Sequence, residues 1–423
     1  MPAPDARWTA PTALGRIAAT VRLPGSKSLT NRALVLAALS ETPTRITAPL
    51  RARDTDLMIG ALRALGVGIA DEPGGLLVTP GPLSGADVEC GLAGTVMRFV
   101  PPLAALATGV SRFDGDPHAR SRPMRPLLDA LRGAGAVLQG ERLPFTVHGQ
   151  GGLPGGIVEL DSAASSQFVS ALLLAAARFD AGADIRHVGA TVPSLPHIEM
   201  TIAGANEAGA VIETVSERRW LVSPGKLDLP DQVIEPDLSN AAPFLAAALV
   251  TGGAVTVPHW PATTSQPGAH LAELLTRMGA NVVLDENGLT VTGTGTISAL
   301  DVDLHEASEL TPVIAALCAL ADGPSRISGV AHIRGHETDR LAALRTELAA
   351  LGADASETED GLIIRPAPLR AGLWHAYADH RMAQAGAVLG LAVSGLQVDD
   401  IGSTSKTLAD FPGLWAGLLE QSA

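Results

Sequence analysis

The sequence predicts an α/β protein with mixed sheets and buried helices, made of six repeats. Three observations support this prediction: glycines that recur at a regular spacing after helix-like segments, apolar helices that recur with the same spacing, and a core composition of small aliphatic residues. Only 3% of the 423 residues are aromatic while 46% are hydrophobic, so Ala, Leu, Val and Ile have to form the core.

The first marker is a helix-like apolar segment that ends at a glycine and is followed by small or β-branched residues. Glycine after a helix typically adopts the left-handed conformation that ends it, and Val or Ile then favours a strand. Each repeat is therefore predicted to contain a helix, a glycine stop and a strand. Successive marker glycines are 69, 74, 70 and 73 residues apart, at Gly66, Gly135, Gly209, Gly279 and Gly352.

The second marker is a more apolar helix with the same period. Ser, Thr or Asp stands at each expected start, and these side chains cap the exposed N–H groups of a helix. The helix bodies are rich in Ala and Leu on all sides, which is typical of buried helices. The starts are separated by 67, 70, 74, 69 and 71 residues and lie near Ser28, Thr95, Ser165, Ser239, Ser308 and Asp379.

The six repeats group as three plus three. The last repeat is too short for a closing strand, because only Glu420–Ala423 follow the helix expected at Leu408–Leu419. We expect the strand-like segment Ile17–Leu23 to supply that strand. This predicts one domain from residues 1–22 plus 236–423, which contains repeats 4–6, and an inserted domain from residues 23–235, which contains repeats 1–3.

Charge and composition exclude several functional classes. The net charge of −14 argues against a nucleic-acid binder, which normally has a basic surface. The longest apolar runs are shorter than the ~20 residues of a membrane span, and no signal peptide is visible. Two cysteines, Cys90 and Cys318, exclude a disulfide framework and a thiolate-rich metal site. We expect a soluble, cytoplasmic protein.

The loops before the apolar helices contain the candidate binding residues. Only three of the 30 basic residues are Lys, and two of them, Lys27 and Lys406, lie in turns rich in Ser and Thr. A compact ammonium group suits an anion there, and each helix N-terminus adds roughly half a positive charge. Taken alone, each loop also fits an ordinary capped helix with exposed basic residues.

Two carboxylates and two histidines stand out among these loops. Glu309 and Glu337 are candidates for proton transfer. His332 and His336 have a spacing that could bind a metal, but Gly335 interrupts the helix and no third ligand is evident, so we predict no metal site. The nucleotide-binding glycine motifs and the nucleophile elbow are absent from the sequence. The set indicates a substrate with several anionic groups that is bound without a cofactor.

Six short motifs follow one another along the chain: Pro24–Ser28 with Arg32, Ala93–Arg98, Ser165–Phe168, Glu337–Arg340, Asp379–Ala383 and Ser403–Thr407. In this order, they resemble the motifs of the 3-phosphoshikimate 1-carboxyvinyltransferase (5-enolpyruvylshikimate-3-phosphate synthase) family. The resemblance implies a two-domain, inside-out α/β barrel of six βαβαββ repeats with buried parallel helices, which closes over substrates bound between the domains. The reaction it implies moves the enolpyruvyl group of phosphoenolpyruvate to the 5-hydroxyl of shikimate 3-phosphate.

The resemblance also implies a role for individual residues. The catalytic residues would be Lys27, Glu309 as the base on the 5-hydroxyl, and Glu337 as the acid that protonates the methylene carbon. The residues that bind shikimate 3-phosphate would be Lys27, Ser28, Arg32, Ser165, Ser166, Gln167, Ser194, Glu309 and His336. Those that bind phosphoenolpyruvate would be Lys27, Gly94, Arg122, Gln167, Arg340, Arg381 and Lys406.

Gly94 also matches the glycine that leaves room for glyphosate, so the resemblance implies inhibition by glyphosate. Three positions depart from the family pattern. Glu309 replaces an Asp and is one methylene longer, His336 replaces a Lys and makes one charge pH-dependent, and Leu92 replaces an Asn and removes a polar contact. We expect these changes to tune the site without abolishing it.

Two alternatives remain at this point. The sister enzyme that transfers enolpyruvyl to UDP-N-acetylglucosamine uses a reactive Cys in the loop that corresponds to Asp114–Arg122, where this chain has Pro117, and Cys90 lies outside the loop. The other alternative is a non-catalytic binder of phosphorylated metabolites. The resemblance implies a monomer that acts on small molecules without a cofactor, a nucleic acid or a membrane.

Overall fold

The computed structural model describes residues 7–189, 192 and 194–421 and divides the chain into two compact units. Unit 1 contains the residues up to Pro24 and those from Pro236 onward, and unit 2 is Gly25–Glu235. The sequence prediction put the first boundary after residue 22 and the second after residue 235. Among the described residues, no helix is long and apolar enough to cross a membrane.

The three sheets of unit 2 share one strand pattern, in which an edge strand pairs in parallel with its neighbour and two antiparallel strands follow. The first sheet has the order β14 (Gln232–Val233), β3 (Thr44–Thr47), β5 (Gly75–Thr79) and β4 (Gly68–Glu72). The second has β6 (Asp87–Glu89), β7 (Thr108–Asp114), β9 (Phe145–Gln150) and β8 (Val137–Gln139). The third has β10 (Gly156–Leu160), β11 (Ala183–His187), β13 (Arg219–Val222) and β12 (Ile212–Ser216).

Unit 1 repeats this strand pattern in two four-stranded sheets and in one three-stranded sheet. The first has the order β2 (Ala18–Thr20), β15 (Ala254–Val257), β17 (Gly288–Thr292) and β16 (Asn281–Asp285). The second has β18 (Asp301–Asp303), β19 (Ser325–Ser328), β21 (Leu362–Arg365) and β20 (Asp354–Glu357). The third has β22 (Leu373–Trp374), β23 (Gln397–Val398) and β1 (Trp8–Thr9).

The prediction that Ile17–Leu23 closes the last repeat is wrong. Strand β2 within that segment pairs in parallel with β15 of the first sheet of unit 1. The last sheet is extended instead by β1, whose Trp8 lies opposite Val398. The repeat that contains β15 begins directly with a helix after the boundary at Pro236, so it has no preceding strand of its own, and β2 takes that position.

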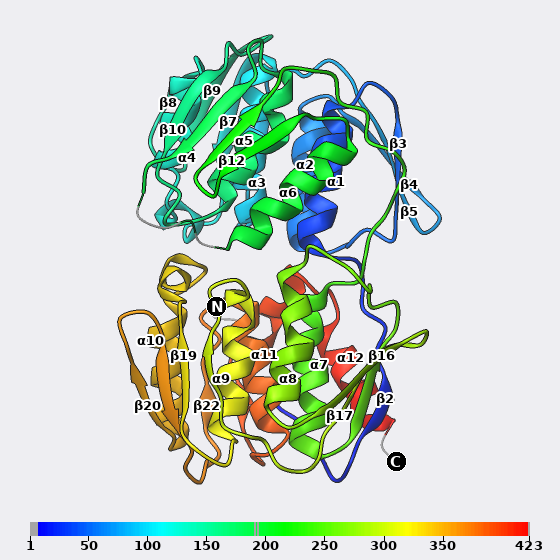
Figure 1. Cartoon of the computed structure of the whole chain (residues 1–423), viewed down its shortest axis with the longest axis vertical. Coiled ribbons are helices and arrows are strands. Elements are labelled where there is room, and N and C mark those ends of the chain that lie inside the picture. The colour runs from blue at the N-terminus through cyan, green and yellow to red at the C-terminus, as the bar shows by residue number, and fades with distance from the viewer. Residues whose placement is uncertain (1–6, 190–191, 193, 422–423) are drawn as a thin grey trace, which may run out of the picture. The chain divides into compact units, whose positions relative to one another are not determined.

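Three buried helices form the centre of each unit. In both units, the three helices contact one another, and Figure 1 shows them side by side inside the strands. All six begin within three residues of the predicted starts, and their bodies are buried as the Ala/Leu-rich composition predicts. Of the six predicted capping residues, only Asp379 caps its helix, whereas Ser26 caps α1 and Asp237 caps α7. In unit 2 they are α1 (Lys27–Leu39), α3 (Gly94–Leu106) and α5 (Gln167–Ala175), and in unit 1 they are α7 (Leu238–Thr251), α9 (Thr311–Ala319) and α11 (His380–Gly390).

A second set of helices, each with one exposed face, packs against the central helices and the sheets. Five of them are followed by the marker glycines, whose φ angles of +92° to +108° confirm the predicted left-handed stops. A strand follows each of these glycines, as predicted. The set consists of α2 (Arg53–Ala64), α4 (Arg125–Gly133), α6 (Leu195–Glu207), α8 (Leu271–Arg277), α10 (Arg340–Leu351) and, near the C-terminus, α12 (Phe411–Glu420).

The close packing of α11 against the N-terminal segment gives a test of the fold. A Cβ atom on Gly390 would lie 2.3 Å from the Cβ atom of Ala10, whereas one on Gly417 in α12 would have no atom within 4 Å. We therefore expect G390A to lower the free energy of unfolding by about 2 kcal/mol through overpacking. We expect G417A to raise it by about 0.5–1 kcal/mol through helix propensity. Urea unfolding of the two variants measures both, and effects of equal sign would contradict this packing.

Candidate functional site

The first group of predicted site residues lies where α1 begins in unit 2. Gly25 has no space for a side chain, because a Cβ atom would lie 2.2 Å from the carbonyl oxygen of Ala48. The Ser26 hydroxyl accepts a hydrogen bond from the amide of Leu29 and caps the helix. Lys27 follows at the first helical position, with its Nζ atom 3.7 Å from the buried carboxylate of Asp54. The loop thus fixes the backbone and leaves the Lys27 side chain about one-fifth exposed.

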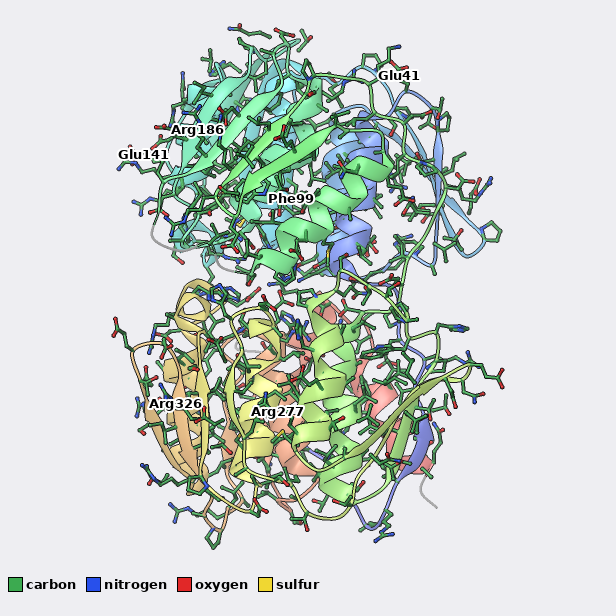
Figure 2. All side chains as sticks on the ribbon, in the orientation of Figure 1. Glu41, Phe99, Glu141, Arg186, Arg277 and Arg326 are labelled. Atoms are coloured by element: carbon green, nitrogen blue, oxygen red, sulfur yellow. The ribbon has the colours of Figure 1, made fainter. Side chains whose placement is uncertain are left out.

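Arg32 lies one turn further along α1 and is buried. Its guanidinium donates to the hydroxyl of Thr201 at 2.8 Å, to the carbonyl of Ser28 at 3.0 Å and to the carbonyl of His197 at 3.0 Å. It also lies 5.3 Å from the ring centre of Phe99, which is labelled in Figure 2. Most of its donors are therefore engaged within unit 2, and its position is fixed by α3 and α6 as well as by its own helix.

The starts of α3 and α5 meet around Gly94. A Cβ atom on Gly94 would lie 3.1 Å and 3.2 Å from the two terminal nitrogens of Arg122 and 3.3 Å from the Oε1 atom of Gln167. Arg122 donates to the carbonyl of Leu92 at 3.2 Å, and Arg98 donates to the same Oε1 atom of Gln167 at 2.7 Å. The structure thus brings a glycine, an arginine and a glutamine together that are far apart in the sequence.

The remaining predicted residues of unit 2 lie at the starts of α1, α5 and α6. The Ser165 hydroxyl accepts a hydrogen bond from the amide of Gln167 at 3.3 Å, and Ser166 is buried beside it. Ser28 is in the first turn of α1. Ser194 precedes α6 with φ +53° and is buried, so a non-glycine residue is held there in the left-handed region. Such strain is common at functional sites.

The second group lies in unit 1 around the buried carboxylate of Glu337. One oxygen of Glu337 accepts from Arg340 at 3.0 Å, and the other pairs with Nζ of Lys406. The Arg340 guanidinium also forms a double interaction with Asp379, at 2.8 Å and 3.1 Å. Asp379 is fully buried and caps α11 by accepting from the amide of Arg381 at 2.9 Å. Two cations and two carboxylates thus form one buried network.

Arg381 and Glu309 lie next to this network. Arg381 donates to the carbonyl of Ser239 at 2.8 Å and to the side chains of Asn240 and Gln384 at 3.2 Å each. Glu309 lies in the 3₁₀ turn η4 (Ser308–Leu310) and has its Oε2 atom 3.6 Å from Arg381. The Glu309 side chain is 30% exposed, whereas that of Glu337 is 9% exposed, so the two carboxylates have different environments.

His336 lies beside Arg340, and its Nδ1 atom is 3.1 Å from the guanidinium. Burial, and then the positive charge of Arg340, lower the pKa of His336 well below its usual range. His336 is therefore neutral near pH 7, and the charge that a lysine would supply is absent. His332 packs against it with ring centres 6.0 Å apart. Among the described residues, no group of three or more potential ligands could hold a metal ion.

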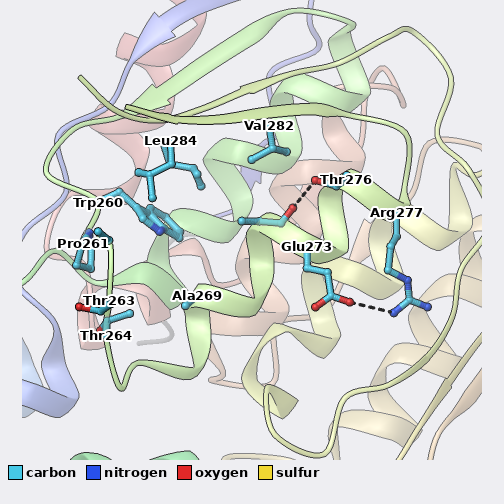
Figure 3. Close-up of a pocket in the computed structure, with 13 residues that line it drawn as sticks. Trp260, Pro261, Thr263, Thr264, Ala269, Glu273, Thr276, Arg277, Val282 and Leu284 are labelled. Atoms are coloured by element: carbon cyan, nitrogen blue, oxygen red, sulfur yellow. Dashed lines mark hydrogen bonds and ion pairs between the residues drawn. The ribbon is translucent and has the colours of Figure 1, made fainter. Parts of the chain in front are cut away.

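A pocket elsewhere in unit 1 has a different character. It has a volume of about 660 Å³ and lies beside Trp260, α8 and Leu284. Figure 3 shows its apolar side chains, with Arg277 paired to Glu273 at the rim. Its lining among the described residues includes none of the predicted site residues, so it is not part of the candidate site.

Comparisons with known proteins agree with the motifs. Residues 11–415 match the EPSP synthase (3-phosphoshikimate 1-carboxyvinyltransferase) family. The chain is 53% identical over 438 aligned positions to a 3-phosphoshikimate 1-carboxyvinyltransferase of Kocuria rhizophila, with 99% of this chain and 97% of the relative covered. The chain belongs to the EPSP synthase family.

Solved structures support the fold of an EPSP synthase. An EPSP synthase of Acinetobacter baumannii superposes with a TM-score of 0.79 at 24% identity and covers 96% of this chain and 97% of its own. The enolpyruvyl transferase NikO of Streptomyces tendae superposes with a TM-score of 0.76 at 19% identity and covers 96% of both chains. The mixed α/β architecture is thus shared with enolpyruvyl transferases beyond close relatives.

Several partners of the EPSP synthase motifs were not among the predicted site residues. Arg98 holds Gln167, Asp379 holds Arg340, and Asn240 contacts Arg381. Arg98 could have been found, because it follows Gly94 by four residues on the same helix. Asp379 was recognised as a helix start and as part of a family motif but was given no role, and nothing in the sequence near Asn240 indicates its partner 141 residues away.

The neutral state of His336 predicts a pH dependence of stability. In the unfolded chain, this histidine takes up a proton as the pH falls through about 6.5, whereas the folded protein does not. The unfolding free energy of unit 1 should therefore decrease as the pH is lowered below about 6.5. At higher pH, His336 should have no effect on this free energy. H336Q removes this dependence. Between about pH 7 and about pH 5.5, the variant should therefore lose about 1 kcal/mol less unfolding free energy than the wild type.

Urea unfolding followed by tryptophan fluorescence measures this difference, since four of the five tryptophans (Trp8, Trp260, Trp374 and Trp415) lie in unit 1. H118Q, which changes an exposed histidine of unit 2, is the matched control. Equal pH slopes for the wild type and H336Q would contradict the neutral state of His336.

Proposed function

We propose that this chain transfers the enolpyruvyl group of phosphoenolpyruvate to the 5-hydroxyl of shikimate 3-phosphate and releases phosphate. The product is 5-enolpyruvylshikimate 3-phosphate, an intermediate of the shikimate pathway to chorismate and the aromatic amino acids. Membership of the EPSP synthase family supports this activity. The structural observation that carries it is the buried carboxylate of Glu337 between the cations of Arg340 and Lys406.

Phosphoenolpyruvate has two anionic groups, and the proposed ligands provide matching donors. Arg340, Arg381 and Lys406 supply cations in unit 1, and Arg122 supplies one in unit 2 beside Gly94 and Gln167. Guanidinium groups suit carboxylate and phosphate because they can donate two parallel hydrogen bonds. In this proposal, Lys27 contacts both substrates.

Shikimate 3-phosphate has a phosphate, a carboxylate and ring hydroxyls, which need many neutral donors. The serine hydroxyls and backbone amides at the starts of α1, α5 and α6 provide such donors, and helix N-termini favour phosphate. The proposed ligands are Lys27, Ser28, Arg32, Ser165, Ser166, Gln167, Ser194, Glu309 and His336. Arg32 already donates hydrogen bonds to several groups of unit 2, which limits the hydrogen bonds that it can donate to the substrate.

The proton steps are assigned to the two carboxylates of unit 1. Glu309, the more exposed of the two, removes the proton from the 5-hydroxyl, whose oxygen attacks C2 of phosphoenolpyruvate while Glu337 protonates C3. The tetrahedral adduct then loses phosphate, and a proton leaves the C3 methyl group to restore the double bond. In this proposal, the anionic substrate competes with Glu337 for Arg340 and Lys406.

The finer architecture belongs to this proposal as well. We infer that each sheet, with its buried helix and its outer helix, is one of six βαβαββ repeats, three in each unit, and that each unit is an inside-out α/β barrel domain with parallel buried helices. The nearly identical strand orders of the sheets support this inference. A monomeric state, a cytoplasmic location and independence of nucleic acid, membrane and cofactor stay predictions of the sequence.

The alternative transfer to UDP-N-acetylglucosamine has little support in the structure. Cys90 is buried, and burial raises the pKa of its thiol far above the usual range, which makes it unreactive. The position of the reactive cysteine is occupied by Pro117, which is exposed. The non-catalytic alternative is tested by the assay below.

The carboxylate roles predict large losses of turnover. Release of phosphate from phosphoenolpyruvate and shikimate 3-phosphate should be readily measured with the wild-type protein. E337Q and E309Q keep the shape of each side chain but cannot transfer the proton, so kcat should fall by about 10²- to 10⁴-fold. E141Q, which changes an exposed glutamate of unit 2, is the matched control and should retain full activity. A folded wild-type protein that releases no phosphate at saturating substrates would instead favour the non-catalytic binder.

The close approach around Gly94 predicts how glyphosate acts. The wild-type protein should be inhibited by glyphosate in competition with phosphoenolpyruvate. In G94A, the added methyl group would meet Arg122 and Gln167 at 3.1–3.3 Å, so both ligands should bind more weakly, with glyphosate affected by about tenfold or more. Inhibition constants and KM values of the two proteins measure this, and unchanged inhibition of G94A would contradict it.

A further inference from the structure

A further buried carboxylate in unit 1 lies two helical turns from Arg340 on α10. Glu347 is 2% exposed and faces the loop between β22 and α11. One of its oxygens accepts from the phenol of Tyr377 at 2.5 Å, and the other accepts from the backbone amide of His375 at 3.0 Å. The His375 ring lies 3.2 Å from the same carboxylate. Tyr377 is the only tyrosine in the chain.

The loop held by Glu347 has an unusual backbone. Tyr377 and Ala378 are consecutive non-glycine residues with φ angles of +55° and +53°. The left-handed region is unfavourable for such residues, and two in succession persist only where surrounding contacts impose the conformation. The contacts of Tyr377 and His375 with Glu347 supply such a constraint.

This strained turn leads directly to the network of the candidate site. Asp379 follows Ala378, forms the double interaction with Arg340 and caps the helix on which Arg381 lies. Helix α10 and the loop are therefore joined at two points, through Glu347 to His375 and Tyr377, and through Arg340 to Asp379. A shift of the turn would move Asp379, and with it both arginines.

We propose that Tyr377, His375 and Glu347 form a positioning cluster that holds the strained turn and thereby sets the orientation of Arg340 and Arg381 for the anionic groups of phosphoenolpyruvate. The assignment of that substrate rests on the proposed function. The phenol of Tyr377 suits this role because burial and the hydrogen bond to Glu347 raise its pKa to about 12, so the phenol keeps its proton and remains a donor.

The test removes only the phenolic oxygen. In Y377F, the turn should open more often. Amide exchange should therefore become about tenfold faster in peptides that cover residues 376–384. These peptides include the hydrogen-bonded amides of Asp379, Arg381 and Ala383. KM for phosphoenolpyruvate should rise about 3- to 10-fold. KM for shikimate 3-phosphate, most of whose proposed ligands lie in unit 2, and kcat should change by less than about twofold.

A rescue variant distinguishes positioning from a general loss of stability. Glycine adopts the left-handed region without strain, so A378G in the Y377F background should return both the exchange rate and the KM for phosphoenolpyruvate toward wild-type values. T346A is the matched control, because Thr346 precedes Glu347 on α10 but donates only within its own helix, to the carbonyl of Ala342. It should change neither quantity.

The possible outcomes separate the two proposals. Unchanged exchange and unchanged KM in Y377F would overturn the positioning cluster while leaving the proposed reaction intact. An equal rise of both KM values, without faster local exchange or rescue by A378G, would show that Tyr377 has only a structural role. This result would also overturn the proposed positioning cluster. If the wild type were inactive, the proposed function would fall, and the exchange data alone would still decide whether the cluster holds Asp379.

Discussion

The buried charge of Arg340 is the constraint on which unit 1 depends. A guanidinium that is 2% exposed loses most of its hydration, and this cost has to be offset by carboxylates at hydrogen-bond distance. Asp379 and Glu337 supply them; although burial lowers the pKa of Arg340, the two carboxylates raise it overall. Asp379 also caps α11, so the same group balances the charge and fixes the helix. The same network of ion pairs thereby links the N-terminal ends of α10 and α11 to the turn η6 (Ile401–Lys406).

Three arginines near the candidate site of unit 2 contact uncharged groups. Arg32 contacts hydroxyls and carbonyls, Arg98 contacts the amide of Gln167, and Arg122 contacts the carbonyl of Leu92. These uncharged oxygens orient the guanidinium groups. In unit 1, by contrast, the carboxylates compete directly with any anion for Arg340 and Lys406. In the proposed reaction, an anionic substrate would therefore change the balance of charges around Glu337.

The sequence was most informative where local chemistry decides the structure. The helix starts and the five glycine stops depend on neighbouring residues, so Thr95 and Gly352 could be placed to within a few positions. The grouping of Glu337, Arg340 and Lys406 followed from the family motifs, although their mutual contacts did not. Long-range pairings could not be predicted, because nothing near Trp8 indicates Val398 as its neighbour. The neutral state of His336 also depends on burial, which spacing along the chain does not reveal.

The placement of β1 and β2 in unit 1 has a consequence for biosynthesis. Unit 2 is complete when Glu235 has been made, but Ala18 needs Ala254 as its strand partner, and Trp8 needs Val398. At roughly 5–20 residues per second, the first strands emerge from the ribosome tens of seconds before the last of these partners exists. The inserted unit can thus fold early, while β2 lacks its strand partner until Ala254 has been made and β1 lacks its partner until Val398 has been made, near the end of translation.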